Sequence, residues 1–318
     1  MPKEDHVNQH IAPQVYLKRF AERDKDKYII GVWQKGEKNR EPKLFYNSVD
    51  NVGYIKRFYD VPNRADPKYW EKFFAEHIDP LYGAPLNTVI ARIILTRPGC
   101  FQLTDNEKRL LATIVASQML RVPRVITKHL DKAPQLLAEW KREFLDTYDG
   151  LIPARQEKII RETQYTKDEI KDIIIGHITD EKSMERYINV LQERLWLIYI
   201  NNTHFPFITS DSPVLQYNIC GNSLDEKDTG IARLDTALIF TLTPRIMLHL
   251  VPRSFGLGML ETYNGKLMVL DDRNMKFISN YNIMQLENCY QQAFMPIEML
   301  EIIQAGEKFV KEQNNNLG

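Results

Sequence analysis

The hydrophobic period of the sequence changes twice along the chain, and these two changes constrain the fold most strongly. Before residue 66, short apolar runs of the strand type alternate with charged turns. From residue 66 to about residue 194, apolar residues recur every three or four positions, as on one face of a helix. Around residue 195 the pattern returns to short apolar runs, separated by Asn, Gly, Asp and Pro. This order predicts an α+β protein.

We expect a single domain over residues 1–312, with a small N-terminal antiparallel sheet, a helical middle, and a C-terminal antiparallel β region followed by helices. Residues 313–318 are expected to form a disordered tail. The predicted strands cover residues 27–34, 43–47, 52–59, 195–200, 205–209, 214–218, 237–242 and 246–251. The predicted helices follow Pro13 and cover residues 69–78, 86–95, 105–123, 136–144, 166–174, 184–195, 271–290 and 297–312. The polar segment 221–235 predicts a surface loop.

Local signals place some helix boundaries. Residues 104–107 and 166–169 each have the capping-box pattern, a Thr followed three positions later by a Glu, before an apolar helical period. Pro123 should end or kink the first of these helices, and Pro134 should interrupt or restart the next one.

Charge and composition exclude several functional classes. The chain has 42 Lys plus Arg and 42 Asp plus Glu, and this zero net charge argues against a general polyanion binder. Its apolar runs are much shorter than the roughly 20 residues that span a bilayer. Because the N-terminus also lacks the pattern of a secretory signal, we expect a cytoplasmic protein without membrane contact. The three cysteines are widely spaced and predict neither a disulfide framework nor a zinc site, and no glycine-rich nucleotide motif is present.

Two polar residues, Gln118 and Arg121, fall on the apolar face of the helix predicted from residue 105. Burying them costs free energy unless they have partners. In a structural role, they could satisfy carbonyls freed by Pro123, or Arg121 could pair with a buried carboxylate. Alternatively, Arg121 could line a cleft together with Arg124 and Lys128, which follow at helical spacing, and hold an anion such as phosphate.

A second unusual segment is residues 205–213, where an apolar strand ends in Thr209, Ser210 and Asp211 before Pro213. A carboxylate at a strand end, held by neighbouring hydroxyls, is suited to bind a divalent metal ion or to orient a base. An Asx turn that caps the bend would give the same pattern. Asp211 is therefore a candidate catalytic residue and metal ligand, and Ser210 is a candidate substrate contact.

His10 is the third candidate, because it directly precedes the short helix that follows Pro13. The positive end of a helix dipole disfavours imidazolium, so His10 would tend to stay neutral and able to accept a proton or bind a metal. A purely structural role would also account for a lone histidine at this position.

Three motifs follow one another along most of the chain: His10-x-x-Pro13-x-x-Tyr16-Leu17-x-x-Phe20, Gln118-x-x-Arg121-x-Pro123, and Phe207-Ile208-Thr209-Ser210-Asp211-x-Pro213-Val214. In this order they resemble a large prokaryotic family of domains of unknown function. The resemblance implies a bacterial protein of a single-domain type, and it implies no particular activity.

Two main hypotheses for the function follow from these residues. In the first, His10, Gln118, Arg121 and Asp211 meet in one polar pocket of a phosphodiester- or nucleotide-directed hydrolase, a nuclease-like protein with a defence or toxin role. His10 would be the general base, Asp211 would hold a divalent metal ion or align the nucleophile, and Arg121 would stabilise the developing negative charge. Arg124 and Ser210 would also contact the substrate, a nucleotide or nucleic acid.

The second hypothesis is a non-catalytic binding or assembly protein, in which the inward polar residues form a structural network. Its protein partner would be unknown. A small-molecule sensor that uses the same pocket without turnover is a third interpretation.

Overall fold

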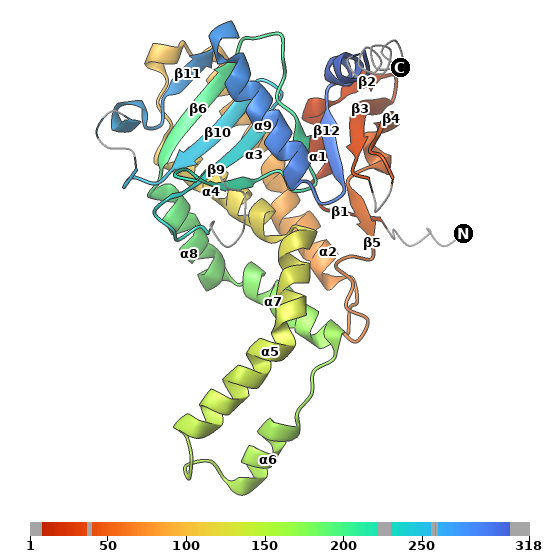
Figure 1. The fold of residues 1–318 in the computed structure, drawn as a ribbon, viewed down its shortest axis with the longest axis vertical. Helices are drawn as coiled ribbons and strands as arrows, with labels where there is room; N and C mark the ends of the chain where they lie inside the picture. The colour runs from red at the N-terminus through yellow and green to blue at the C-terminus, as the bar shows by residue number, and fades with distance from the viewer. Residues whose placement is uncertain (1–7, 37–39, 222–229, 256–257, 259, 306–318) are drawn as a thin grey trace, which may run out of the picture.

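The computed structural model describes residues 8–36, 40–221, 230–255, 258 and 260–305. Two β-sheets lie beside each other in the body, with helices packed against them, and one helical arm projects away from the body (Figure 1). The order along the chain is as predicted, with an N-terminal antiparallel sheet, a helical middle, and C-terminal strands followed by helices in one α+β domain.

The first sheet brings the two ends of the chain together. It contains β2 (Glu22–Asp24), β3 (Lys27–Gln34), β4 (Lys43–Ser48), β7 (Thr209–Ser210) and β12 (Gln292–Met295). Strand β12 lies between β3 and β7, and all the pairings are antiparallel. The predicted strands over residues 27–34 and 43–47 are confirmed. The sheet is not built from N-terminal residues alone, however, because β7 and β12 come from the second half of the chain.

A separate two-stranded sheet pairs β1 (Asn8–His10) with β5 (Tyr54–Lys56), and α1 (Gln14–Leu17) follows β1. The predicted strand over residues 52–59 is thus reduced to three residues. Gly53 and Arg57 explain this difference, because their φ angles of 66° and 51° turn the chain on either side of β5.

The second sheet has the order β11-β6-β10-β9-β8. Its strands are β6 (Leu195–Asn201), β8 (Leu215–Asn218), β9 (Thr236–Thr243), β10 (Ile246–Val251) and β11 (Leu267–Leu270). Strand β11 was not predicted, and it pairs with β6 in parallel, so the C-terminal β region is not purely antiparallel. Of the strand predicted over residues 205–209, only Thr209 belongs to a strand, since Pro206 has no N–H to donate to a neighbouring strand.

The helical middle begins after residue 68 and ends at residue 192. Its helices are α2 (Tyr69–Phe73), a π-helix (Phe74–Ile78), α3 (Ala84–Leu95), α4 (Asp105–Leu120), α5 (Pro123–Thr147), α6 (Ala154–Glu162), α7 (Lys167–Thr179) and α8 (Glu181–Gln192). Short 3₁₀ turns occur elsewhere at Lys18–Phe20, Val49–Asn51, Asp79–Tyr82, Pro98–Cys100, Leu260–Tyr263 and Asp272–Asn274.

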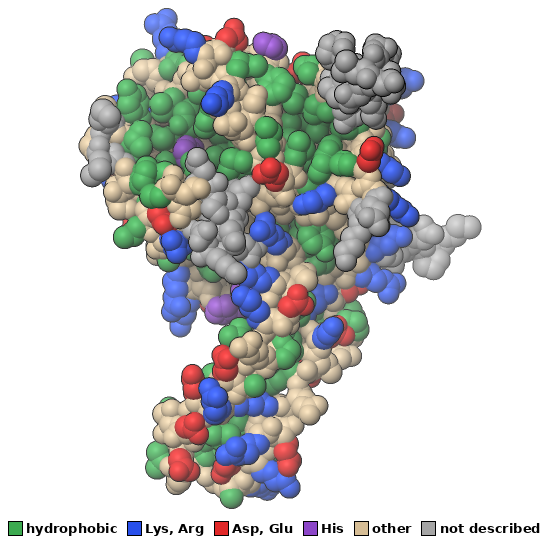
Figure 2. Space-filling model, viewed as in Figure 1, with side chains coloured by type: hydrophobic (Ala, Val, Ile, Leu, Met, Phe, Trp, Pro, Cys, Tyr) green, Lys and Arg blue, Asp and Glu red, His purple; other side chains and the backbone are tan. Residues whose placement is uncertain are grey.

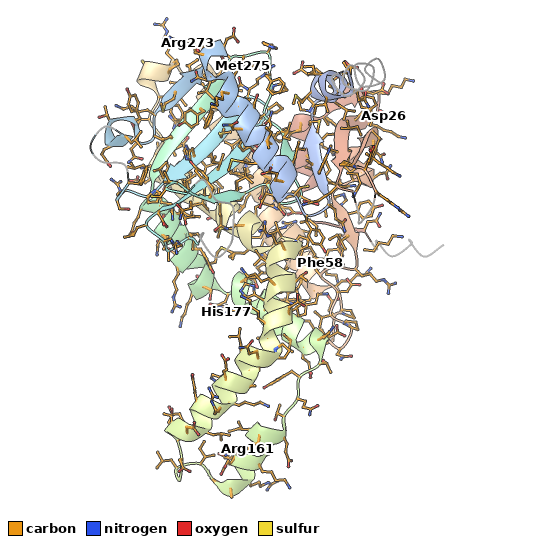
Figure 3. The ribbon with its side chains drawn as sticks, in the orientation of Figure 1. Asp26, Phe58, Arg161, His177, Arg273 and Met275 are labelled. Atoms are coloured by element: carbon orange, nitrogen blue, oxygen red, sulfur yellow. The ribbon has the colours of Figure 1, made fainter. Side chains whose placement is uncertain are left out.

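The two helix starts predicted from capping boxes and the effect of Pro123 are confirmed. Both capping boxes form, at the starts of α4 and α7, and a bend of 53° separates α4 from α5 at Pro123. Pro134, in contrast, lies inside a continuous α5. It is exposed, so water can satisfy the carbonyl that it leaves unpaired. Helix α6 was not predicted; it forms the far end of the projecting arm, where Arg161 is labelled in Figure 3.

The C-terminal part contains α9 (Met275–Asn288), which ends two residues earlier than predicted, and a helix that covers residues 297–305 of the described chain. The rest of the helix predicted to residue 312, the predicted tail 313–318, and residues 222–229 of the predicted loop lie outside the described residues. In the part of the chain that the structure describes, no single helix has the length and apolarity needed to cross a membrane, although the bent pair α4–α5 meets this test by length and composition alone.

Tyr16 links the first sheet and the second sheet in the core. Its side chain is fully buried, its hydroxyl lies 2.7 Å from Thr209 Oγ1, and it donates to the carbonyl oxygen of Thr241 at 2.8 Å. Its ring stacks on Phe240 of β9. The first and third sequence motifs, which contain Tyr16 and Thr209, therefore meet inside the protein.

Candidate functional site

The last turn of α4 holds the N-terminal segment through Gln118. Its Nε2 donates to the carbonyl oxygen of Ile11 at 3.1 Å, and its Oε1 accepts from the hydroxyl of Tyr82 at 3.1 Å. Gln118 is fully buried, as the helical spacing predicted. The carbonyl that it satisfies belongs to the first motif, not to the chain near Pro123.

Arg121 makes a second connection to the same segment. Its Nη1 donates to Asp79 Oδ1 at 2.7 Å, and its Nη2 donates to the carbonyl oxygen of His10 at 2.9 Å. Only 1% of the side chain is exposed. Burial disfavours the charged guanidinium, but Asp79 and the hydroxyls of Tyr59 and Tyr82 raise the pKa of Arg121 above its ordinary value. Arg121 is therefore a charged residue paired with a carboxylate, as the structural alternative predicted.

His10 lies at the end of β1 and faces an open acidic pocket that Asp50, Glu71 and Asp79 also line. Its Nε2 lies 3.2 Å from Gln14 Nε2, which can only donate. Burial lowers the pKa of His10, although Asp79 acts in the opposite direction. The imidazole is thus expected to be neutral, as predicted, but burial is the cause, because α1 has only four residues and a correspondingly small dipole.

The carboxylate of Asp211 accepts hydrogen bonds from the backbone of the segment that connects α9 with β12. Its Oδ1 accepts from the N–H of Tyr290 at 2.7 Å, and its Oδ2 accepts from the N–H groups of Gln291 and Gln292 at 2.7 and 2.8 Å. Burial raises the pKa of Asp211 to about 6, and these three N–H donors act against the shift. Among the described residues, no group of three or more His, Cys, Asp or Glu side chains could hold a metal ion. The geometry thus gives no support for the predicted metal role of Asp211.

Ser210 also makes contacts inside the protein. Its hydroxyl donates to Gln285 Oε1 at 2.8 Å and accepts from the N–H of Ser212 at 3.1 Å, and both Ser210 and Gln285 are fully buried. This arrangement fixes the bend before Pro213, and it leaves the predicted substrate contact of Ser210 without structural support.

The structure therefore brings three of the four predicted pocket residues together around the N-terminal segment, and it gives the fourth, Asp211, other hydrogen-bond partners. His10, Gln118 and Arg121 meet around the N-terminal segment, whereas Asp211 binds the chain after α9. Within the described ranges, no hydrogen bond or ion pair joins Asp211 to His10 or to Arg121. The single centre that the hydrolase hypothesis assumed does not form through direct contacts.

A different site lies where α4, α5, the segment after β7 and the end of α9 meet. It is a cavity of about 160 Å³, which we call the Ser212 cavity. Its polar lining residues are Gln118, Arg124, Lys128, His129, Ser212, Gln216 and Asn288. Figure 2 shows Lys and Arg side chains gathered around the point where α5 leaves the body. The second and third motifs thus contribute neighbouring residues to one cavity.

Ser212 is the most unusual residue in this cavity. The side chain is only 4% exposed, and its Oγ has no hydrogen-bond partner in the part of the chain that the structure describes. The neighbouring Asn288 accepts from Arg124 Nη1 at 2.5 Å and lies 3.5 Å from the carbonyl oxygen of Ser212. A buried hydroxyl without a partner is costly, and the residue that carries this one lines a cavity beside an oriented guanidinium.

The charged side chains among the described residues of the Ser212 cavity are basic. Arg124 and Lys128 lie one helical turn apart on α5, and no acidic side chain is among the described residues that line the cavity. His129 Nδ1 lies 2.7 Å from the carbonyl oxygen of Val125, which can only accept, so Nδ1 carries a proton. In the neutral ring, Nε2 is then the proton acceptor. The cavity is thus suited to an anion that accepts several hydrogen bonds.

Only part of this site had a signal in the sequence. Arg124 and Lys128 follow Arg121 at helical spacing, and Ser212 is next to Asp211. All three residues are therefore close in sequence to residues that the motifs single out. His129 and Asn288 had no such signal. Asn288 enters the cavity because α9 packs against the segment after β7, a contact between residues 76 positions apart.

Comparison with known proteins identifies the family of the chain. A comparison with curated proteins and a comparison with solved structures each give no significant match. A family model described as "Protein of unknown function (DUF4238)" matches residues 8–296, which include all three motifs and every residue of the Ser212 cavity. The chain therefore belongs to the DUF4238 family, in agreement with the resemblance to a family of unknown function.

Proposed function

We propose that this protein binds a phosphate-bearing small molecule, such as a nucleotide, in the Ser212 cavity. The observation that carries the proposal is the buried Ser212 hydroxyl, which has no partner among the described residues, in the wall of a cavity that Arg124 and Lys128 also line. Phosphate oxygens accept hydrogen bonds from hydroxyl, guanidinium and ammonium groups together, and a fixed Arg is well suited to bind them.

The size of the cavity supports a ligand of this kind. A volume of about 160 Å³ equals that of roughly five water molecules in the liquid. This space fits one phosphate group, whereas the remainder of a nucleotide would extend through the opening. Binding of one phosphate also agrees with the zero net charge of the chain. Binding a long polyanion requires a large excess of Lys and Arg over Asp and Glu.

The proposed location of the protein is the cytoplasm. All three cysteines, Cys100, Cys220 and Cys289, are unpaired, which is typical of a reducing compartment.

Removing the Ser212 hydroxyl should weaken binding without lowering stability. In the variant Ser212→Ala we expect AMP to bind about 5- to 10-fold more weakly, because one hydrogen bond of about 1 kcal/mol is lost. The free energy of unfolding should rise by about 1 kcal/mol or more, because the variant removes a buried hydroxyl that has no described partner. Isothermal titration calorimetry with AMP and with inorganic phosphate measures the first effect, and urea unfolding measures the second.

Ser210→Ala is the matched control, because Ser210 lies two residues away with a fully satisfied hydroxyl. It should lower the free energy of unfolding by about 1–2 kcal/mol and leave the affinity for AMP unchanged. In the same titrations, Lys128→Ala should weaken binding, and Lys132→Ala, one turn further along α5 and exposed, should not. Absence of binding by the wild type, or equal effects of Ser212→Ala and Ser210→Ala on affinity, would contradict the proposal.

Hydrolysis of a bound phosphodiester is a second candidate function, favoured by the fixed tautomer of His129 at the cavity. A neutral imidazole with Nε2 as the acceptor can serve as a general base. If the protein is a hydrolase, His129→Ala should reduce turnover of bis(p-nitrophenyl) phosphate by about 100-fold or more, whereas His177→Ala, at an exposed position on α7, should have no effect. If the wild type binds AMP but does not hydrolyse bis(p-nitrophenyl) phosphate, the result supports binding without hydrolysis as the function.

A further inference from the structure

A second cavity lies on the opposite side of the last turns of α4. It has a volume of about 280 Å³ and lies between the π-helix after α2, α4, and the junction of α7 with α8. His177, labelled in Figure 3, marks the end of α7 that borders it. Its lining is mainly apolar and includes Phe74, Ile78, Leu120, Ile178, Met184 and Ile188. We call it the Arg121 cavity, because Arg121 is the charged residue buried in its wall.

The Nε atom of Arg121 is a hydrogen-bond donor that neither Asp79 nor the N-terminal segment uses. Arg121 Nη1 and Nη2 bind Asp79 and the carbonyl oxygen of His10, but Nε has no partner among the described residues. A buried N–H without an acceptor costs free energy, and the side chain that carries it lines a cavity. This N–H is covered by neighbouring atoms, so a ligand oxygen in the cavity would satisfy it after a small shift of the Arg121 side chain toward the cavity.

The charges around the cavity determine what kind of oxygen fits. The charge of Arg121 is already balanced by Asp79 at 2.7 Å, so a second anion would be left without a counter-ion in an apolar cavity. Near the opening, Arg109 and Glu185 form a bidentate ion pair with distances of 2.9 and 2.6 Å, which leaves that pair neutral as well. The ligand oxygen therefore belongs to a neutral group such as a ketone, an ester or an amide.

The backbone at the cavity is also unusual. Residues Phe74–Ile78 form a π-helix, a rare conformation that is frequent at functional sites, and both Phe74 and Ile78 line the cavity. The ring of Phe74 lies 4.9 Å from the guanidinium carbon of Arg121, so the π-helix packs directly on the residue with the unused donor.

We propose that the Arg121 cavity binds a neutral, mainly apolar small molecule that accepts one hydrogen bond from Arg121 Nε. Its volume is roughly twice that of an engineered 150 Å³ cavity that binds benzene, so a ligand of about 10–15 non-hydrogen atoms fits. This site is distinct from the Ser212 cavity, because Ser117, Leu120 and Arg121 line one cavity and Gln118, Met119 and Val122 line the other.

The test compares two probes of the same shape, the ketone 4-phenyl-2-butanone and the carboxylate 3-phenylpropionate, in calorimetric titrations of the full chain. We expect the ketone to bind at least about 10-fold more tightly than the carboxylate, because only the ketone avoids burying an unpaired charge. Equal or tighter binding of the carboxylate, or no binding of the ketone, would overturn the proposal.

The position of the site is tested with a variant that fills the cavity. Met184→Trp should weaken ketone binding at least about 10-fold, since the larger side chain occupies the space of the ligand. Met268→Trp, a half-buried methionine on β11, is the control and should bind the ketone like the wild type. If Met184→Trp does not fold, Thr113→Phe fills the same cavity from α4. Unchanged ketone binding in the folded cavity-filling variant contradicts the assignment.

Discussion

Replacing Asp211 by alanine is expected to lower the free energy of unfolding by about 2–4 kcal/mol. The carboxylate is 5% exposed and accepts three backbone hydrogen bonds from Tyr290, Gln291 and Gln292. Its loss removes the acceptors that fix the turn between α9 and β12, and it leaves the N–H groups of Tyr290, Gln291 and Gln292 without this partner. Chemical unfolding of Asp211→Ala and of the wild type measures the difference.

The control for this experiment is Asp131→Ala, because Asp131 is exposed on α5 and its removal should change the free energy of unfolding by less than about 0.5 kcal/mol. The experiment also separates the structural role of Asp211 from the catalytic role that its sequence context suggested. Wild-type stability in Asp211→Ala, combined with complete loss of a phosphodiesterase activity, would contradict the structural role.

Lowering the pH from 7 to 4 is expected to reduce the free energy of unfolding by about 3 kcal/mol because of one histidine, His249 on β10. Burial lowers the pKa of His249 from 6.5 to about 4. Its Nε2 lies 2.9 Å from the hydroxyl of Tyr217, and its Nδ1 has no described partner that could stabilise a charged ring. Between pH 6.5 and pH 4 the unfolded chain therefore binds a proton that the folded chain does not.

The sign of this effect follows from the lowered pKa. The contribution of neutral His249 to the free energy of unfolding is fully present above pH 6.5, and it is lost as the pH falls toward 4. In His249→Phe, which cannot titrate, the free energy of unfolding should fall less between pH 7 and pH 4 than in the wild type, by about 3 kcal/mol. His204→Phe, at an exposed position, is the control for replacing a histidine by phenylalanine. Parallel curves for His249→Phe and the wild type would show that His249 does not stay neutral in the fold.

Most of the fold could be predicted from the sequence where the signal is local. The capping boxes at residues 104–107 and 166–169 start helices as expected, because their hydrogen bonds involve only residues three positions apart. The strand-type apolar run at residues 27–34 also gives the observed strand β3. Such local signals do not show which strands pair with each other. We therefore did not predict that β12 lies between β3 and β7, or that β11 pairs with β6 in parallel.

The candidate site was predicted in part, for a related reason. Gln118 and Arg121 break the apolar period of α4, so their burial was visible in the sequence. Whether they face a ligand or another part of the chain depends on contacts with Ile11, His10 and Asp79, which are at least 42 positions away. Ser212 Oγ and Arg121 Nε are the two atoms without a hydrogen-bond partner on which the ligand proposals rest. That they have no partner can be seen only in the folded structure, where the positions of all neighbouring donors and acceptors are known.

The most direct test of the proposed function is a crystal structure of the protein grown with AMP. We expect the phosphate group in the Ser212 cavity, within hydrogen-bonding distance of Ser212 Oγ and beside the side chains of Arg124 and Lys128. AMP bound instead against His10 and Asp79, or a Ser212 cavity that holds only water at saturating AMP, would contradict the proposal.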